Sequence, residues 1–219
     1  MAELVIQNAI HSFGWKQLIS GIDLRCATGD LIGIYGRNGS GKSTLLKLIF
    51  GTLRADHLSL KIDDVSIRPW QIIPHRWIGY LPQDPFLPAH LKVRDVIPLC
   101  FSRGVAQDAV FHAPFIERMA TKKIGNLSLG ERRYLEVVLI GQMEHPFLLL
   151  DEPFSMIEPL YKDQIKEFLH RLASRKGIIM TDHYYQDVLA IANKNYVLSA
   201  GKLLPIQDEQ DLQEHGYLR

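Results

Sequence analysis

The residues with the clearest chemistry form one run that fits the spacing G-x-x-x-x-G-K-[ST] of a phosphate-binding loop. Its glycines let successive backbone N–H groups point at phosphate oxygens, and the helix expected after it adds a partial positive charge. Lys42 is placed to reach β- and γ-phosphates, and the hydroxyl of Ser43 to bind Mg²⁺. The residues offered to a nucleotide are Gly36, Arg37, Asn38, Gly39, Ser40, Gly41, Lys42, Ser43 and Thr44. The alternative is a glycine-rich turn with a solvated lysine.

Two acids end a strongly apolar run. Residues 147–150 read Phe-Leu-Leu-Leu, and Asp151 and Glu152 follow at once. A buried strand would deliver Asp151 next to Mg²⁺, where it can hold the ion through a water, and Glu152 beside the water that attacks a γ-phosphate. The alternative is a strand that simply ends in solvated acids.

Gln83 and His183 each follow a short apolar run, 78–81 and 177–180. Gln83 could touch Mg²⁺ or the attacking water, and His183 could hydrogen-bond the γ-phosphate. Taken singly, neither means much, because glutamines are common in loops and a lone histidine is more often a satisfied core or surface residue. Their value depends on the order of motifs along the chain.

The composition is that of a soluble globular protein. The chain has 219 residues, a net charge of +1, 47% hydrophobic and 22% charged residues. No long basic run is present, so nucleic acid is not expected as a partner. No apolar run reaches the roughly 20 residues needed to cross a bilayer, and no secretory signal opens the chain. Cys26 and Cys100 lack metal-ligand spacing and are expected to be reduced, buried thiols.

Apolar runs alternate with amphipathic ones, which predicts a mainly parallel sheet covered on both faces. Expected strands are 4–13, 22–27, 31–35, 58–63, 78–81, 147–150, 177–180 and a hairpin over 195–204 with its turn at Ala200-Gly201. Expected helices are 44–50, 130–143, 161–175 and 187–192. Between about 88 and 123 we expect helical pieces, broken by Pro98, Gly104 and Pro114.

In order, the chain holds Phe13-Gly14, the phosphate loop, Gln83, Leu127-Ser128-Leu129-Gly130-Glu131, Asp151-Glu152-Pro153 and His183. This order resembles the ATP-binding cassette (ABC) ATPase family over nearly the whole chain. The run 127–131 stands where that family carries its signature, usually Leu-Ser-Gly-Gly-Gln. The resemblance implies an α/β fold in one ABC ATPase domain over 1–219. A P-loop NTPase core with a mainly parallel sheet would carry an N-terminal antiparallel β subdomain, and a helical subdomain inserted at approximately 84–146.

The resemblance also implies roles for residues. Phe13 would stack on adenine, with Trp15 as a competitor for that place. The catalytic set would be Lys42, Gln83, Glu152 and His183, and the Mg²⁺ ligands Ser43, Gln83 and Asp151. Two copies of the chain would bind head to tail, so that Ser128 and Gly130 of one copy meet the ATP held by the other. An ordinary helix cap explains Ser128 equally well.

Three departures from the family pattern bear on activity, one of them a helical insertion that looks short and proline-broken. Leu129 replaces the first signature glycine and would be strained if the backbone there has a positive φ. Glu158 ends Ser155-Met156-Ile157-Glu158, where the family usually reads Ser-Ala-Leu-Asp, and its extra methylene bears on communication between the two ATP sites of the dimer.

The function expected is that of an Mg²⁺-dependent ATPase subunit on the cytoplasmic face of a membrane, driving a separate permease through a socket at 83–88 and the helices that follow. The alternatives are a soluble ABC-type ATPase and a nucleotide-gated scaffold.

Overall fold

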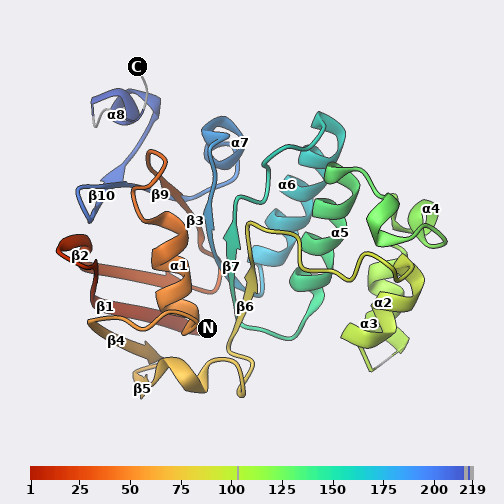
Figure 1. Cartoon of the computed structure of the whole chain (residues 1–219), viewed down its shortest axis with the longest axis horizontal. Coiled ribbons are helices and arrows are strands. Elements are labelled where there is room, and N and C mark those ends of the chain that lie inside the picture. Colours follow the sequence, from red (N-terminus) through yellow and green to blue (C-terminus); the bar gives the residue numbers. More distant parts are fainter. Residues whose placement is uncertain (103, 215–216, 218–219) are drawn as a thin grey trace.

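The structure is a computed structural model that describes residues 1–102, 104–214 and 217. Its strands are β1 (Glu3–Phe13), β2 (Lys16–Ala27), β3 (Leu31–Tyr35), β4 (His57–Ile62), β5 (Val65–Ile67), β6 (Ile78–Leu81), β7 (Phe147–Asp151), β8 (Gly177–Thr181), β9 (Lys194–Ser199) and β10 (Lys202–Ile206). Its α-helices are α1 (Lys42–Phe50), α2 (Val93–Cys100), α3 (Gly104–Phe111), α4 (Ile116–Met119), α5 (Leu129–Gln142), α6 (Pro159–Ala173), α7 (Tyr185–Leu189) and α8 (Glu209–Glu214). In Figure 1 the strands and α1 fill the left half, α2 to α4 the right edge, and α5 and α6 lie between them.

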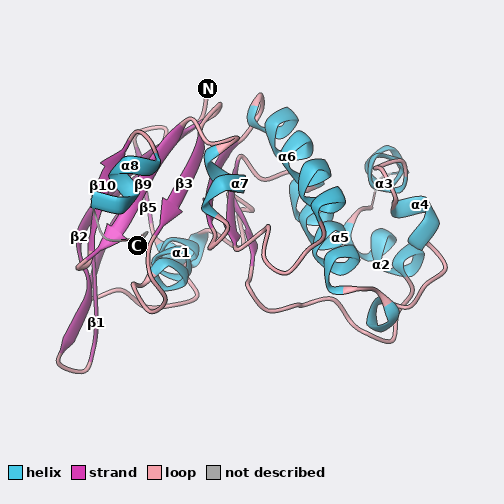
Figure 2. Ribbon diagram, turned by 90° about the horizontal axis from the view of Figure 1, so that it is seen from above, coloured by secondary structure: helices cyan, strands magenta, loops and turns pink. Residues whose placement is uncertain are grey.

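Two sheets organise the described part of the chain. The six-stranded sheet has the order β10-β9-β3-β8-β7-β6, and all of its neighbouring pairs are parallel except β10 with β9. The four-stranded sheet, β2-β1-β4-β5, is antiparallel. Figure 2 shows both sheets on the side of the molecule opposite to α2, α3 and α4. The predicted parallel sheet and N-terminal antiparallel subdomain are confirmed.

The central strands are buried on both faces because successive side chains point into two different cores. Ile34 and Leu149 pack with α1 and the antiparallel sheet, in a core that also contains Leu45 of α1. Leu148 and Leu150 belong to the other core, with α5 and α6. The continuous apolar runs read from the sequence follow from this two-sided burial.

The inserted helices differ from the prediction at Pro98. The break expected there is wrong, since α2 runs from Val93 to Cys100 with Pro98 inside it. Val93, Val96 and Ile97 are buried and hold the helix, whereas Arg94 and Pro98 are exposed. Water can therefore satisfy the Arg94 carbonyl, which loses its usual i+4 partner at the proline. Gly104 begins α3, and Pro114 does separate α3 from α4.

Other elements were found with small differences or were missed. β3 and β6 have the predicted bounds, and the terminal hairpin turns at Ala200-Gly201 as expected. β5 is only three residues long and α8 is six, too short to give a clear periodicity. Helix α7 begins at Tyr185, two residues before the predicted start. Over residues 1–102, 104–214 and 217, no helix combines the length and apolar character that crossing a bilayer requires.

The cysteines fit the prediction in part. Both thiols are free; Cys26 is buried and Cys100 is half-buried. Burial raises the pKa of both thiols, which keeps them protonated at neutral pH.

Gly177 marks a close approach of the two sheets and gives a test of the packing. A Cβ added there would lie 2.7 Å from the Cys26 sulfur and 2.8 Å from the Ala27 carbonyl oxygen. Because the backbone oxygen cannot swing away, Gly177→Ala should lower the free energy of unfolding by about 1–3 kcal/mol. Gly104→Ala, where a Cβ would meet nothing within 4 Å, is the matched control. Chemical denaturation measures both, and equal stabilities would contradict the packing.

Candidate nucleotide site

The site forms where parallel strands end. β3, β8, β7 and β6 are neighbours and run in the same direction, so the segments after them share one edge of the sheet. The phosphate loop follows β3, Gln83 follows β6, Glu152 follows β7, and Asp182 and His183 follow β8. Segments far apart in sequence therefore meet at this edge.

The phosphate loop depends on two glycines with left-handed backbones. Gly39 has φ +76° and Gly41 φ +105°, values that L side chains rarely adopt. Gly41 caps α1 without a side-chain hydrogen bond, which leaves the first N–H groups of the helix available to an anion. Helix α1 starts at Lys42, two residues earlier than predicted.

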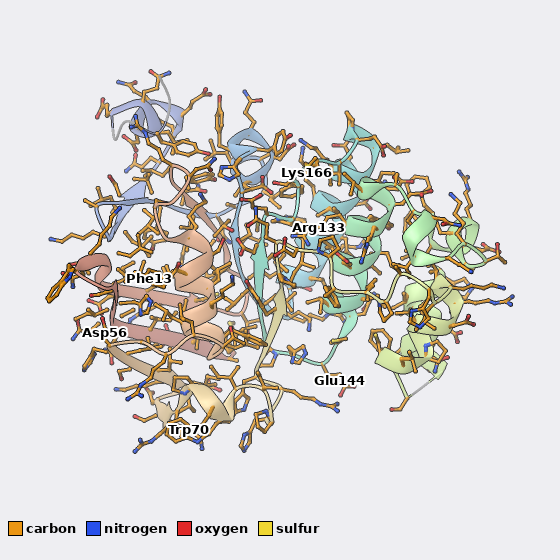
Figure 3. The ribbon with its side chains drawn as sticks, in the orientation of Figure 1. Phe13, Asp56, Trp70, Arg133, Glu144 and Lys166 are labelled. Atoms are coloured by element: carbon orange, nitrogen blue, oxygen red, sulfur yellow. The ribbon has the colours of Figure 1, made fainter. Side chains whose placement is uncertain are left out.

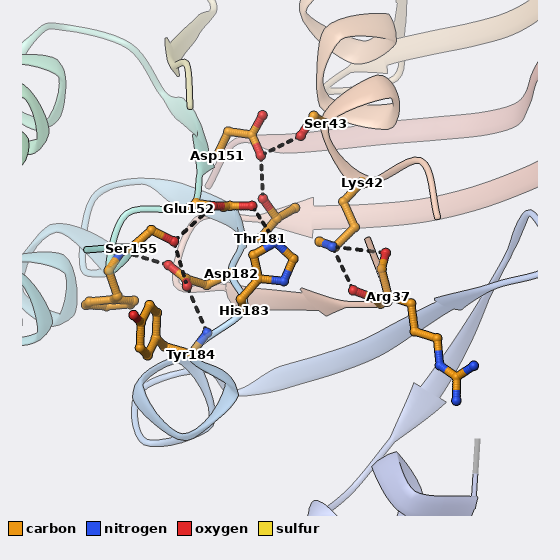
Figure 4. A network of polar contacts seen from close by, with 12 residues as sticks. Arg37, Lys42, Ser43, Asp151, Glu152, Ser155, Thr181, Asp182, His183 and Tyr184 are labelled. Atoms are coloured by element: carbon orange, nitrogen blue, oxygen red, sulfur yellow. Dashed lines mark hydrogen bonds and ion pairs between the residues drawn. The ribbon is translucent and has the colours of Figure 1, made fainter. Parts of the chain in front are cut away.

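Lys42 is held inside the loop. Its Nζ donates to the Gly36 carbonyl at 2.7 Å and lies 3.5 Å from the Arg37 carbonyl, and the residue is only 6% exposed. Burial lowers its pKa, while the nearby carboxylates of Glu152 and Asp151 act in the opposite direction. In Figure 4 the Arg37 side chain points away from Lys42. The Gly36 carbonyl oxygen thus accepts from the ammonium, within the protein, as a phosphate oxygen would.

Asp151 and Ser43 bring oxygen atoms together at the start of α1. The Ser43 hydroxyl donates to Asp151 Oδ1 at 3.0 Å, and Thr181 Oγ1 donates to the same oxygen at 2.7 Å. The Tyr80 hydroxyl reaches Asp151 Oδ2 at 3.3 Å. Among the described residues no group of three or more His, Cys, Asp or Glu side chains could hold a metal. A hydroxyl and one carboxylate beside a phosphate loop fit Mg²⁺, which keeps several waters and binds substrate phosphates.

The carboxylate of Glu152 faces His183. His183 Nε2 lies 2.8 Å from Glu152 Oε1, and Ser155 Oγ donates to Oε2 at 2.9 Å. Glu152 is only 7% exposed, and its backbone has φ +56°, an uncommon value for a non-glycine residue. Its N–H donates to the Thr181 carbonyl at 2.8 Å, which ties the segment after β7 to the end of β8.

A hollow of about 310 Å³ unites most of the predicted residues. Its lining consists of Leu18, Asn38, Gly39, Ser40, Gly41, Lys42, Ser43, Thr44, Gln83, Glu152 and His183. Gly36 and Arg37 line a neighbouring hollow on the side of β9. Leu18 was not foreseen. It comes from the early part of β2, which begins at Lys16, six residues before the predicted strand 22–27.

Phe13 is not brought into this hollow. It ends β1, is 56% exposed, and packs edge-on against His11 at 4.6 Å between ring centroids. Figure 3 shows it among the strands, on the side away from the inserted helices. Trp15, its competitor, is fully exposed in the turn between β1 and β2. Stacking of either ring on adenine remains a prediction.

Ser128 and Gly130 lie apart from the phosphate loop of their own chain. Ser128 is exposed and caps α5, accepting from the Glu131 N–H at 3.1 Å, while Glu131 Oε2 accepts from the Ser128 N–H at 2.9 Å. Gly130 is buried, and a Cβ there would lie 3.0 Å from Glu158 Oε2. This reciprocal cap is the ordinary structural role left open above.

The strain anticipated at Leu129 does not arise. Leu129 is the first residue of α5, is absent from the residues with positive φ, and is 57% exposed. A side chain at the first turn of a helix points outward without crowding the backbone. The signature position therefore accepts leucine without local distortion in this chain.

The sequence did not predict a buried polar network next to the site, which we call the Arg133 brace and which consists of Arg133 and Glu136 of α5. The Arg133 guanidinium donates to the carbonyls of Asp151, Glu152 and Pro82, the last at 2.7 Å, and pairs with Glu136 at 3.4 Å. Arg133 is 7% exposed and Glu136 1%, and Figure 3 shows Arg133 near the centre of the molecule. The brace connects α5 with the ends of β6 and β7. The signal in the sequence was a pair of opposite charges, Arg133 and Glu136, three residues apart at positions of the predicted helix that turn out to be buried.

Comparisons with known proteins agree with this architecture. The family model described as ABC transporter matches residues 19–155. The lipopolysaccharide export system ATP-binding protein LptB of Acidithiobacillus ferridurans is 29% identical over 231 residues, covering 100% of this chain and 96% of the relative. The protein of the same name from Escherichia coli is 30% identical over 219 residues, covering 93% and 90%.

Solved structures show the same fold. An ATP-binding subunit of an ABC transporter superposes with a TM-score of 0.83 at 18% identity, covering 97% of this chain and 93% of the other. A dimeric ATP-binding cassette bound to ADP and phosphate gives 0.80 at 20% identity, covering 93% and 98%. With the phosphate loop, the acids at the end of β7 and the histidine after β8 at one sheet edge, the chain belongs to the ABC transporter family.

Proposed function

We propose that this chain is the Mg²⁺-dependent ATPase subunit of an ABC transporter. The observation that carries the proposal is the meeting of Lys42, Ser43, Gln83, Glu152 and His183 around one hollow. This set combines a phosphate cradle, a carboxylate base and a histidine, which is what in-line attack of water on a γ-phosphate needs. Release of phosphate from ATP and Mg²⁺ by the purified chain, with or without its permease, tests the proposal directly. ATP binding without turnover in both settings would favour a nucleotide-gated scaffold.

In the proposed reaction the phosphate loop amides and Lys42 hold the charge that develops on the transferred phosphoryl group. Mg²⁺, when bound by Ser43 and Asp151 with Gln83 in reach, neutralises phosphate charge. Glu152 Oε1 lies 2.8 Å from His183 Nε2 and Oε2 accepts from Ser155, yet each carboxylate oxygen keeps a lone pair for the attacking water. His183 is 38% exposed at its side chain and lines the hollow, so it can hydrogen-bond a γ-phosphate.

We further propose a head-to-tail dimer in which Ser128 and Gly130 meet ATP on a second copy. In support, Ser128 is exposed at a helix start and lines no part of the hollow in its own chain. The solved cassette bound to ADP and phosphate, which shares this fold, is itself a dimer.

A negative charge introduced at position 128 distinguishes two roles of Ser128, the capping of α5 and the contact with ATP on a second copy. Ser128→Asp and Ser128→Asn both cap helices well, so neither should unfold α5. Aspartate would repel a partner's γ-phosphate, and ATP-induced dimerisation should weaken by about tenfold or more, whereas asparagine should preserve it. Light scattering of each variant with ATP in a Glu152→Gln background measures this. Equal dimerisation of the two variants would leave Ser128 as a cap alone.

The permease contact is proposed at the outer part of a groove of about 580 Å³ that overlaps the hollow, sharing Asn38, Gln83, Glu152 and His183 with it. Its lining includes Gln83, Asp84 and Pro85 from the segment after β6, with Arg132 and Glu136 of α5. Leu87 of the predicted socket is a core residue at 5% exposure, whereas Phe86 is 42% exposed. A permease seated here would place the chain at the cytoplasmic face of a membrane. Copurification with a multi-span protein supports this, and stimulation of ATPase activity by nucleic acid would favour a soluble ATPase instead.

A further inference from the structure

Both oxygens of the Glu152 carboxylate are held by side chains, one from the same segment after β7 and one from the segment after β8 (Figure 4). Oε1 lies 2.8 Å from His183 Nε2, and Oε2 accepts from Ser155 Oγ at 2.9 Å. Ser155 Oγ also lies 3.3 Å from Asp182 Oδ1. A hydroxyl has one proton, so it donates chiefly to the nearer acceptor, Glu152.

Asp182 is the buried centre of this arrangement. It is 0% exposed and accepts the Phe154 N–H at Oδ2, 2.7 Å, and the Tyr184 N–H at Oδ1, 2.9 Å. One carboxylate therefore fixes the backbone on both sides, next to Ser155 and next to His183. Burial raises the pKa of Asp182, and the backbone hydrogen bonds oppose that rise.

The segment after β7 needs such an anchor. Glu152 and Met156 have φ of +56° and +57°, so the backbone on both sides of Ser155 is in a sparsely populated region. Such conformations persist only where surrounding contacts over-determine them. The bonds to Asp182 and the Ser155 hydroxyl supply these contacts.

We propose that Ser155 and Asp182 are positioning residues for ATP hydrolysis, an inference that rests on the ATPase function proposed above. Ser155 fixes the second oxygen of Glu152, and Asp182 holds Ser155 and His183 in place relative to each other. The Glu152 carboxylate is thereby oriented before water and nucleotide bind. The free energy needed to orient it is then not part of the activation barrier of the chemical step. ATP binding does not depend on this aim, so the effect falls on kcat and not on KM.

Ser155→Ala tests the hydrogen bond between Ser155 and Glu152 without changing the buried Asp182. It removes the hydroxyl and leaves the backbone bonds to Asp182 intact. We expect kcat to fall about 10- to 100-fold with KM for ATP unchanged, because a small misplacement of a reacting group has effects of this size. Ser155→Thr, which keeps a hydroxyl on the same carbon, should restore most of the rate. Thermal unfolding checks that both variants are folded.

A second comparison distinguishes positioning from general destabilisation. In a Glu152→Gln background, Ser155→Ala should change the residual single-turnover rate less than twofold, because the carboxylate it aims is gone. The same fractional loss in both backgrounds would overturn the proposal, as would a Ser155→Ala kcat equal to or above the wild-type value. A wild-type chain that binds ATP without hydrolysing it would overturn the proposed function and this inference together, and the wild-type assay alone reveals that case.

Discussion

Glu152→Gln is expected to slow ATP hydrolysis by about 10²–10⁴-fold while ATP binding survives. The amide has nearly the shape of the carboxylate and can still accept from the Ser155 hydroxyl, which lies 2.9 Å from the present oxygen. It cannot take a proton from water. Because the variant binds ATP and does not consume it, two copies should remain closed around nucleotide long enough to be isolated.

Single-turnover phosphate release and size-exclusion chromatography with ATP measure the two effects. Glu167→Gln is the matched control. It removes one carboxylate from α6 at an exposed position, where the side chain is 61% exposed and paired with Arg171. Its rate should stay near that of the wild type, since an exposed ion pair of this kind contributes little. Unchanged hydrolysis in Glu152→Gln would remove Glu152 from its proposed role.

Lys42→Met should weaken ATP binding by about 100-fold or more. Hydrogen bonds from a charged donor contribute about 1.5–3 kcal/mol each, and the loss of two to phosphate oxygens gives this factor. Folding should be little affected, because methionine keeps the length of the buried stem and carries no charge to desolvate. The bonds lost in the free protein are those to the Gly36 and Arg37 carbonyls.

Isothermal titration calorimetry with ATP and Mg²⁺ measures the affinity. Lys47→Met serves as the control, since Lys47 lies one and a half turns further along α1 and is exposed. Its affinity should match that of the wild type. Equal losses in both variants would mean that overall charge, and not contact with phosphate, decides binding.

Much of the site was predictable because its parts are local. The phosphate loop, the acids at the end of β7 and the histidine after β8 each stand in a short segment whose neighbours set its conformation, and the structure gathers the loop, Glu152 and His183 around one hollow. What escaped prediction joins segments far apart in sequence. Arg133 reaches the carbonyls after β6 and β7, and Asp182 reaches Phe154 and Ser155, 28 and 27 positions away.

The sequence by itself determined the loop that can hold phosphate, the apolar strands that deliver the acids, and the family to which they belong, since all of these depend on spacing and periodicity along the chain. The tertiary structure decided which partners hold those residues. It placed Ser155 and His183 on the two oxygens of Glu152, put Leu18 beside the loop, and left Phe13 outside the hollow. Such contacts depend on which strands become neighbours in the sheet. The spacing of residues along the chain does not specify that order of strands, so it does not specify which side chains meet at their ends.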